Sequence, residues 1–508
     1  MRFVCWREVE VQTVLTPDQM RSLEKQAFSL GVPSLLLMEN AAREAHRALS
    51  ERLDGLSGKD ILFLIGTGNN GGDGLAMARL CCLAGGKPRV VMTGAIKTED
   101  AKANLGYVMA LGIPAISWPD RMEETILLPR PDAVVDAVYG TGFHGILPEG
   151  AAQLAVIVNS WSIPRIALDI PSGMDSLTGE IHGPVFTATN TLALGHLKTG
   201  HCLARLPGIM GEVQVLPLGI PESAYQVLSL DSLLHALEAE DLVPRLPKRA
   251  ANAHKGDNGR VLMYMGSMGL AGAAGMAAQA ALACLRSGAG LVTVACEREI
   301  IPILQSLAPN ATCVSIGDAV MNPPKYDVFA VGCGLGQSEA AWRNILALWD
   351  RAKPSVWDAD ALNLLTARPM ALGEMAVLTP HPGEAARLLG RSTETVLSDL
   401  LSAAHELQRR YGGTVVLKSA VTILRDQAHT AVNLVGSPAL AKGGSGDALA
   451  GIIAALLAQS PGEVPIEAAR TACLWHGMAG RLAAERLGLL SPLTGDVIEC
   501  LGPVAVSK

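Results

Sequence analysis

The sequence predicts an α/β protein with two domains. Apolar runs of strand length alternate with segments of helix length, and this alternation occurs twice. A stretch rich in proline and polar residues, 221–258, separates the two series. At 508 residues the chain is too long for one hydrophobic core, and its 49% hydrophobic content is ample for two. Strands separated by helices indicate βαβ units and mainly parallel sheets.

The first series is assigned to a domain spanning 13–222. A helix is predicted to begin at Thr16, because a threonine cap, proline in first position and glutamine in third are typical of helix starts. Strands are predicted at 60–65, 88–92, 133–138, 165–170 and 191–194, with helices at 75–84 and 101–111.

The second series is assigned to a domain spanning 228–505. Strands are predicted at 260–265, 290–295, 327–331, 355–358, 376–379 and 414–418. The apolar segment 448–457 is predicted to be a helix. The segment 270–285 is too short and too weakly apolar to span a bilayer, so a buried helix is expected there.

Composition excludes several classes of function. The net charge of −7 and an aromatic content of 4% give no basic stripe or base-stacking surface for nucleic acid. Ten cysteines without a CxxC pair indicate reduced thiols, and residues 1–12 have no apolar core of a secretory signal. We therefore expect a soluble, cytoplasmic protein without a membrane or nucleic-acid partner.

The most informative motif is Lys442-Gly443-Gly444-Ser445-Gly446-Asp447, directly before the apolar helix. Glycine reaches positive φ without steric cost, so successive N–H groups can converge on one point at a helix N-terminus and bind phosphate. A carboxylate at Asp447 then suits the removal of a proton from an attacking hydroxyl. The alternative is a first-turn carboxylate that only offsets the helix dipole.

Two glycine loops follow strands of the first domain. The spacing GxGxxG occurs at Gly66, Gly68 and Gly71, and again at Gly140, Gly142 and Gly145. A dinucleotide-binding dehydrogenase needs an acid at the end of the next strand. The first loop lacks one, whereas the second has Asp169, so the dehydrogenase alternative stays open for that loop.

Oxygen-bearing side chains lie at or just past strand ends in the same domain: Asn70, Asp136, Asp169 and Ser172. Because the carboxyl ends of parallel strands converge, we expect these groups to meet in one crevice. Hard oxygen ligands suit an alkali or alkaline-earth cation. The alternative is ordinary turn chemistry.

The motifs together identify a family. Asn69-Asn70-Gly71-Gly72-Asp73-Gly74, Val135-Asp136-Ala137, Gly140-Thr141-Gly142 and Asp169-Ile170-Pro171-Ser172-Gly173 resemble the NAD(P)H-hydrate epimerase domain. His254-Lys255-Gly256-Asp257-Asn258-Gly259, Gly332-Cys333-Gly334-Leu335-Gly336, Asp358-Ala359-Asp360-Ala361-Leu362, Thr379-Pro380-His381-Pro382-Gly383-Glu384 and the Lys442–Asp447 motif resemble the ADP-dependent NAD(P)H-hydrate dehydratase domain. In this order they resemble the bifunctional bacterial enzymes that repair hydrated nicotinamide cofactors.

The resemblance implies a Rossmann-like three-layer αβα domain followed by a ribokinase-like αβα domain. The first is expected to interconvert the R and S epimers of NAD(P)HX, the C6 hydrates of NADH and NADPH. The second is expected to dehydrate the S epimer with ADP as phosphoryl donor. A homo-oligomer, a tetramer or larger, is also implied.

The resemblance assigns roles in the second domain. Asp447 becomes the base on the C6 hydroxyl, and the β-phosphate of ADP is assigned to Gly443, Gly444, Ser445 and Gly446. The rest of ADP is assigned to Lys418, Ser419, Ala420, Val421 and Thr422, and the hydrated dinucleotide to Ala273, Gly334, Gly336 and His381.

Some of these assignments leave alternatives open. A core or turn role remains for Ala273 and the two glycines, and a loop-bracing role for His381. Mg²⁺ is implied without a readable ligand set. Ser445 stands where the family usually has threonine, and Cys333 where proline is common.

The resemblance also assigns roles in the first domain. Asp169 is expected to be the acid–base group, with Lys198 as its partner, and K⁺ is assigned to Asn70, Asp136 and Ser172. The residues expected to cradle the dinucleotide are Asn69, Asn70, Gly71, Gly72, Asp73, Gly140, Thr141, Gly142, Phe143, His144, Gly145 and Ile146. The alternatives are a turn-capping carboxylate for Asp169 and a solvated loop charge for Lys198.

A rival interpretation remains from the phosphate motif alone. A ribokinase-like kinase of vitamins or other small molecules, with a non-catalytic nucleotide-binding first domain, would carry the same glycine loop. The choice between ADP and ATP likewise depends on the resemblance.

Overall fold

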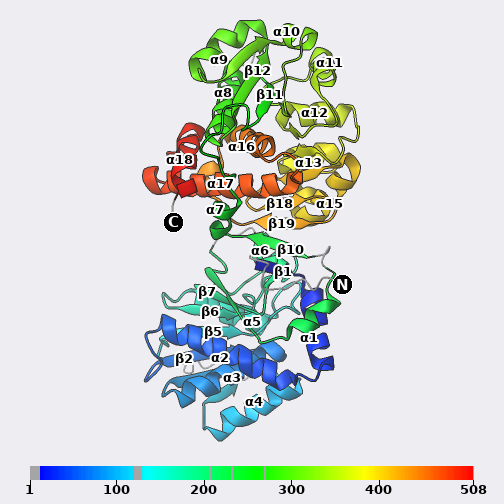
Figure 1. Ribbon diagram of the computed structural model, residues 1–508. Coiled ribbons are helices and arrows are strands. Elements are labelled where there is room, and N and C mark those ends of the chain that lie inside the picture. Colours follow the sequence, from blue (N-terminus) through cyan, green and yellow to red (C-terminus); the bar gives the residue numbers. More distant parts are fainter. Residues whose placement is uncertain (1–11, 119–128, 205–207, 230–232, 268–270, 507–508) are drawn as a thin grey trace. The chain divides into compact units, whose positions relative to one another are not determined.

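The computed structural model describes residues 12–118, 129–204, 208–229, 233–267 and 271–506. The chain divides into two compact units, Thr13–Leu234 and the part that begins at His235 (Figure 1). Between residues 217 and 259 the chain forms η3 (Glu222–Val227), β10 (Leu234–Leu237), η5 (Ala239–Asp241) and α7 (Leu242–Arg245), and β10 lies beside β19 in the larger sheet. The segment expected as a plain connection, 221–258, therefore contains short regular elements.

Unit 1 contains a parallel sheet in the order β4-β3-β2-β5-β6-β7-β9. Its strands are β2 (Asp60–Ile65), β3 (Lys87–Met92), β4 (Ala115–Ser117), β5 (Ala133–Ala137), β6 (Arg165–Leu168), β7 (Asn190–Leu194) and β9 (Glu212–Leu216). The five predicted strands are confirmed. The prediction missed β4 and β9, and also β1 (Gln12–Leu15) and β8 (Leu197–Lys198), which pair with each other.

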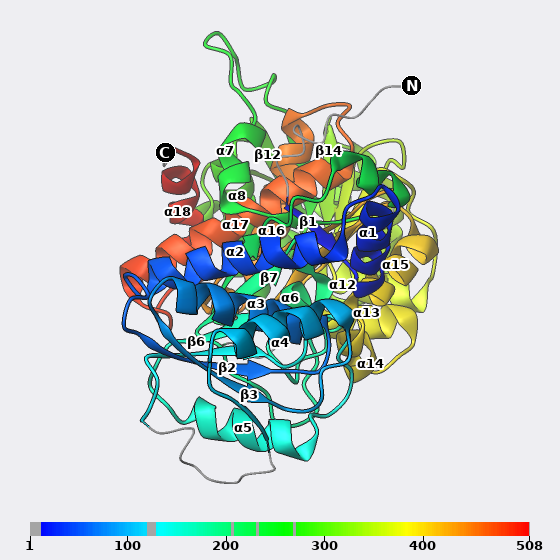
Figure 2. The ribbon, with the colours of Figure 1, turned by 90° about the horizontal axis from the view of Figure 1, so that it is seen from below.

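Helices cover both faces of this sheet. They are α1 (Pro17–Ser29), α2 (Ser34–Arg52), α3 (Asn69–Leu83), α4 (Glu99–Ala110), α5 (Glu149–Asn159) and the short α6 (Thr199–Leu203). Figure 2 shows α5 on the opposite side of β2 and β3 from α2, α3 and α4. Accordingly Phe63 belongs to one buried cluster, and Leu62 and Leu64 belong to the other. Both faces of the strand are apolar because both are covered.

One helix start is confirmed and one is corrected. Thr16 accepts a hydrogen bond from the backbone N–H of Gln19, whose side chain accepts one from the N–H of Thr16. In contrast, α3 begins at Asn69 rather than at residue 75. Its first turns contain glycines, which disfavour helix; at Gly74 a Cβ would lie 2.4 Å from the Cβ of Ala137. Close packing on β5 therefore outweighs propensity.

Unit 2 has a larger sheet, in the order β13-β12-β11-β14-β15-β16-β17-β18-β19. Its strands are β11 (Arg260–Tyr264), β12 (Leu291–Cys296), β13 (Thr312–Ser315), β14 (Val328–Val331), β15 (Ser355–Trp357), β16 (Ala376–Leu378), β17 (Thr414–Leu417), β18 (Thr422–Arg425) and β19 (Thr430–Asn433). The six predicted strands are confirmed and parallel. Strand β13 and the antiparallel pair β18–β19 were not predicted.

The longer helices of unit 2 are α8 (Ala271–Arg286), α11 (Glu339–Leu348), α15 (Leu400–Tyr411), α16 (Ser445–Gln459), α17 (Pro465–Leu487) and α18 (Thr494–Val506). Shorter helices are η6 (Arg298–Ile300), α9 (Ile301–Leu307), α10 (Ile316–Met321), α12 (Ala359–Ala367), α13 (Pro382–Leu389), α14 (Thr393–Ser398) and η7 (Pro438–Leu440).

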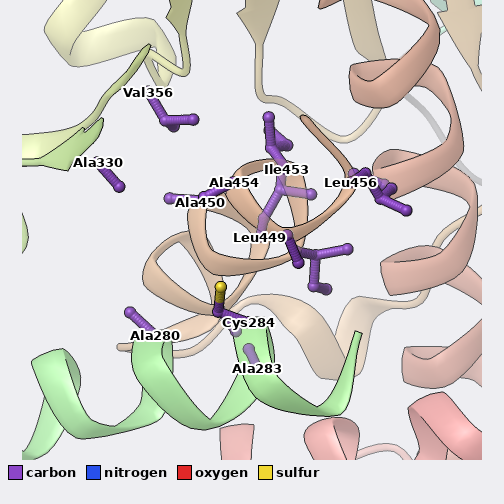
Figure 3. Close-up of a cluster of buried hydrophobic side chains, with 14 of the residues drawn as sticks. Ala280, Ala283, Cys284, Ala330, Val356, Leu449, Ala450, Ile453, Ala454 and Leu456 are labelled. Atoms are coloured by element: carbon purple, nitrogen blue, oxygen red, sulfur yellow. The ribbon is translucent and has the colours of Figure 1, made fainter. Parts of the chain in front are cut away.

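Helix α16, which follows the phosphate motif, is buried along almost its whole length. In Figure 3 its side chains, among them Ala450 and Ile453, lie between α8 and the side chains of Ala330 and Val356 on the sheet. A Cβ at Gly451 would lie 2.2 Å from the carbonyl oxygen of Ala280, so α8 and α16 can approach this closely only at glycine. This packing fixes the position of the motif.

The predicted buried helix at 270–285 is confirmed from Ala271 on as α8, which has many buried residues, and residue 270 lies outside the described residues. Among the helices of the described ranges, none combines the length and the apolar character that a bilayer span requires. The cysteines of these ranges are all free thiols.

Candidate active sites

Unit 1 contains a cavity of about 400 Å³ at the carboxyl ends of β2, β5 and β6. Ligands of open parallel sheets bind at this edge. The predicted site residues that line it are Asn69, Asn70, Asp73, Gly140, Thr141, Gly142, Phe143, Asp169 and Lys198. Of the four side chains expected to meet in one crevice, Asn70 and Asp169 line this cavity, whereas Asp136 and Ser172 are not part of its lining.

Glycines bring the first two loops into backbone contact. A Cβ at Gly66 would lie 1.7 Å from the carbonyl oxygen of Val138, and one at Gly71 would lie 2.1 Å from the carbonyl oxygen of Gly66. At Gly72 a Cβ would lie 2.6 Å from the methyl group of Met38. Gly71 and Gly72 thus lie inside α3 and are not part of the cavity lining.

The end of the second loop is placed differently from its beginning. His144 Nδ1 lies 2.7 Å from the carboxylate of Asp175, and the side chain of Ile146 is 63% exposed. Neither residue, nor Gly145, is part of the cavity lining. Of the loop 140–146, the structure brings the first four residues to the cavity.

Asp169 has a left-handed backbone, with φ of 64°, which a non-glycine residue adopts at a cost of about 1–3 kcal/mol. Its carboxylate forms a buried ion pair with Lys198 and accepts a hydrogen bond of 3.2 Å from the N–H of Thr141. His201 Nδ1 accepts from the N–H of Lys198, so Nε2 carries the proton and donates to the carbonyl oxygen of Asp169, 2.7 Å away. Burial lowers the pKa of His201 to about 4, which keeps it neutral.

Lys198 is placed by the pairing of β8 with β1, in which Leu15 is its register partner. Its side chain is 1% exposed, and Nζ donates to the carbonyl oxygen of Leu194 at 2.6 Å as well as to Asp169. Lys198 is therefore not a solvated loop charge. Asp169, with which it pairs, lines the cavity, and its carboxylate is bonded to groups outside its own turn.

The candidate K⁺ ligands fall into two groups. Asn70 has both polar side-chain atoms buried, and neither has a hydrogen-bond partner in the described part of the chain. Its side chain lies against Gly140, where a Cβ would be 3.2 Å from Asn70 Cγ and equally far from an oxygen of Asp169. Buried polar groups usually have a partner, so these two atoms are available to a ligand or an ordered water.

Asp136 and Ser172 form the second group, behind the cavity wall. Both Ser172 N–H and Ser172 Oγ donate to Asp136, at 2.7 and 2.6 Å, and the N–H of Val138 donates at 3.2 Å. Burial raises the pKa of Asp136 to about 6. No cationic side chain of the described residues forms an ion pair with Asp136, whose carboxylate is held by these three donors alone.

Sequence reasoning missed one wall of this cavity. Met20, Arg21, Glu24 and Phe28 of α1 line it. The start of α1 was predicted from its capping box, but no motif indicated which face meets the cavity. His201, which supports Asp169, was also missed because its role depends entirely on tertiary contacts.

The phosphate motif of unit 2 forms a tight turn at the start of α16. Gly444 has φ of 90°, and a Cβ there would lie 2.4 Å from Gln279 Oε1 of α8. Thr494 Oγ1 donates to the carbonyl oxygen of Gly443 at 3.0 Å. These contacts hold the turn, and with it the backbone N–H groups at the start of the helix, in a fixed conformation, as an anion site requires.

Asp447 lies in the first turn of α16 within a cluster of ionisable groups. Its carboxylate accepts a hydrogen bond from the thiol of Cys333, and ligand atoms of Cys333, Asp358 and Asp447 all lie within 4.8 Å of one another. Lys418 Nζ forms an ion pair of 2.8 Å with Asp358, and a Cβ at Gly446 would lie 3.0 Å from that Nζ. Burial, followed by the charge of Asp358, raises the pKa of Asp447.

Lys418 begins the connection between β17 and β18. Burial alone would lower its pKa, but the carboxylates of Asp358 and Glu384 outweigh burial and raise the pKa. The next residues assigned to ADP, 419–422, complete the connection and start β18, and Ala420 is exposed. Of the five, Lys418 alone has its side chain in the cluster around Asp447. Asp358 and Glu384 belong to motifs of the sequence, but they were not predicted as site residues.

His381 caps α13. Its Nδ1 accepts from the N–H of Gly383 at 3.0 Å, and its own N–H donates to Glu384 at 2.9 Å. The loop-bracing role is thus present, while half of the ring remains exposed. Burial lowers the pKa of His381, followed by the charge of Lys418.

The glycine loop 332–336 is held by neighbouring polar groups. Ser267 Oγ donates to the carbonyl oxygen of Gly334 at 3.0 Å, and the N–H of Gly336 donates to Asp360 at 2.8 Å. Ala273 lies in α8, and its side chain is outside the described part of the structure.

Two family models match the chain. The model described as NAD(P)H-hydrate dehydratase matches residues 261–501, and that described as YjeF-related protein N-terminus matches residues 34–200. A bifunctional NAD(P)H-hydrate repair enzyme Nnr of Coxiella burnetii is 37% identical over 486 residues, covering 94% of this chain and 96% of the relative. The chain belongs to this family of repair enzymes. Both the resemblance and the α/β fold class are confirmed.

A second relative matches over nearly the whole chain, and a solved structure matches about half of it. The relative of the same name from Escherichia coli K12 is 35% identical over 501 residues, covering 96% of this chain and 93% of the relative. Among solved structures, an ADP/ATP-dependent NAD(P)H-hydrate dehydratase from Bacillus subtilis, co-crystallised with ATP and Mg²⁺, is 29% identical with a TM-score of 0.48 and covers 53% of this chain and 96% of that one. Family membership over nearly the whole chain favours a repair enzyme over the vitamin-kinase alternative.

Proposed function

We propose that this chain repairs hydrated nicotinamide cofactors, by interconverting the R and S epimers of NAD(P)HX in unit 1 and dehydrating the S epimer in unit 2 at the expense of ADP. The observation that carries the proposal is the buried carboxylate of Asp447, one turn inside the helix that the glycine loop begins. An acceptor of protons beside an anion site suits phosphoryl transfer to a hydroxyl. Family membership covers both halves of the reaction.

In unit 2 the C6 hydroxyl of the substrate is a poor leaving group. Asp447 takes its proton while the oxygen attacks the β-phosphorus of ADP, and AMP leaves with the electron pair of the broken P–O bond. The N–H groups of Gly443–Gly446 would hold the β-phosphate oxygens, and Lys418 is close enough to offset their charge. Loss of phosphate from C6, with the lone pair of the ring nitrogen, and loss of a proton from C5 then give NAD(P)H.

Mg²⁺ would supply charge neutralisation on the phosphates. Among the described residues, the one group of side chains close enough together to hold a metal ion contains Cys333, and its Asp358 is already paired with Lys418. A thiol is a poor ligand for Mg²⁺. We therefore propose that Mg²⁺ enters with the nucleotide, coordinated mainly by phosphate and water.

In unit 1 the C6 hydroxyl leaves as water, with the electron pair of the ring nitrogen forming an iminium, and water returns on the other face. Asp169 is the proposed proton carrier, and its ion pair with Lys198 fixes its orientation. K⁺ is proposed at Asn70, Asp136 and Ser172, where it would compensate the buried charge of Asp136. The loops that begin at Asn69 and at Gly140 would hold the dinucleotide. Assembly into a tetramer or larger remains a proposal.

In the test, the chain is incubated with a mixture of R and S hydrated NADH, ADP, Mg²⁺ and K⁺. The near-ultraviolet absorbance of the reformed dihydronicotinamide is measured over time. Recovery of the whole pool is expected. Recovery that stops at the S fraction would contradict the epimerase half. No recovery with ADP or ATP, together with phosphorylation of a thiazole or pyrimidine alcohol, would favour the kinase alternative.

A further inference from the structure

A carboxylate of α1 has no role in the function described so far. Glu24 lines the cavity of unit 1 together with Asp169 and Lys198. Within the described ranges it has no hydrogen-bond or ion-pair partner, whereas the neighbouring Arg21 is paired with Asp18. A partly buried carboxylate without a partner is unfavourable, so its presence in a cavity points to a role in binding or in the reaction.

The position of Glu24 is fixed by a rigid helix. The capping box at Thr16 sets the start of α1, and the fully buried Leu23 and Ala27 attach its other face to the core. Residues four apart share one face of a helix, and Glu24 lies midway between Met20 and Phe28, which also line the cavity. The helix therefore presents one stripe to the substrate space, with Glu24 as its acidic member.

Epimerisation requires proton transfer on both faces of the ring. Hydroxide leaves C6 on one face and must take a proton, and water must lose a proton as it adds to C6 on the other face. Asp169, held by Lys198 and Thr141, approaches from the end of β6. A single fixed carboxylate serves one face, so the reaction needs a second group from a different element.

We propose that Glu24 is this second acid–base residue of the epimerase site. On one face it donates a proton to the departing C6 oxygen, which leaves as water while the ring nitrogen supplies the electron pair of the iminium. Asp169 accepts the proton of the water that adds on the opposite face, and the roles exchange in the reverse direction. The inference rests on the proposed epimerase function.

The electrostatics of the cavity support this role. Burial raises the pKa of Glu24, followed by the negative charge of Asp169, although Lys198 and Arg21 act in the opposite sense. Asp73, also in the lining, is affected similarly, with burial first and Asp169 second. Glu24 therefore retains a proton more readily than an ordinary glutamate and can donate it.

The experiment compares the wild-type chain with Glu24→Gln, which keeps the size and polarity of the side chain but cannot transfer a proton. Purified R or S hydrated NADH is incubated in H₂¹⁸O without ADP. Inversion at C6 and incorporation of the label are measured separately by chromatography and mass spectrometry. Glu44→Gln, at a partly exposed position of α2 outside the cavity lining and paired with Arg47, is the matched control.

In Glu24→Gln, inversion is expected to fall by about 10²–10⁴, the usual contribution of one acid–base group. The epimer whose hydroxyl faces Asp169 should continue to exchange oxygen without inversion, since that face keeps its catalyst. ADP-dependent dehydration of the pure S epimer, which takes place in unit 2, should equal that of the wild type, and the retained oxygen exchange shows that unit 1 is folded. Glu24→Asp should restore part of the inversion.

Inversion at C6 by Glu24→Gln at the rate of the wild-type chain would overturn the inference. Equal loss of exchange and inversion would overturn it too, because that result indicates a positioning role for α1. If the wild-type chain itself fails to invert either epimer, the proposed epimerase function fails, and this inference with it.

Discussion

The most direct test of the dehydratase site replaces Asp447 by asparagine. The carboxamide has nearly the shape of the carboxylate and can still accept a hydrogen bond from the Cys333 thiol. It cannot accept a proton from the C6 hydroxyl. The substitution therefore removes the proposed base while leaving the glycine turn and its N–H groups in place.

The expected size of the effect follows from the surroundings of Asp447. Asp447 is 9% exposed and its carboxylate lies in one cluster with Asp358, so bulk water cannot readily substitute for it. Loss of a positioned general base typically lowers the rate by about 10²–10⁴, or about 3–5 kcal/mol of transition-state stabilisation. Removal of one of two neighbouring negative charges should not lower the free energy of unfolding.

The assay measures turnover of S hydrated NADH with ADP, alongside ADP binding by calorimetry and thermal unfolding. Asp447→Asn should bind ADP and unfold like the wild type, and turnover should fall. Glu463→Gln, on the surface of the same unit, controls for substitution itself. Near-normal turnover of Asp447→Asn would refute the assignment of the base.

Three further predictions follow from the same geometry. Asp447 must be ionised to act, and burial raises its pKa, so a pH–rate profile should show kcat for dehydration falling with decreasing pH at values above the ordinary aspartate range. A fall of kcat only within the ordinary aspartate range would contradict this prediction. Lys198→Met should cost about 3–5 kcal/mol in chemical denaturation by leaving the carboxylate of Asp169 buried and unpaired, whereas Lys102→Met, in an exposed pair, should cost about 0–1 kcal/mol; equal effects would exclude a structural role for the buried pair. Asp136→Ala should weaken the K⁺ dependence of epimerisation in a titration with KCl, and an unaltered response would remove that residue from the cation site.

The sequence predicted the regular elements well where signals were local. Most strands of both sheets were predicted, because apolar runs between glycine-rich turns need no knowledge of distant partners. The capping box at Thr16 likewise depends on residues three apart. Strands as short as β4, and the antiparallel pair β18–β19, escaped because short runs carry little periodicity.

The motifs also predicted which strand ends carry polar groups. Asp169 and Asn70 were expected in one crevice, and both line the cavity of unit 1. The late part of the second glycine loop was expected there too, but His144 pairs with Asp175 outside the lining. Spacing fixes which residues can reach a loop, whereas the path of the loop depends on what it packs against.

The sequence by itself determined the fold class, the order of the two domains and the family, because these depend on local periodicity and on motifs contiguous in the chain. Tertiary structure decided the electrostatics of the sites. Lys198 reaches Asp169 through the pairing of β8 with β1, and α1 brings Glu24 to the same cavity. Charges separated widely in sequence shift each other's pKa only when folding brings them close together and removes the water between them. No local pattern encodes that spatial distance.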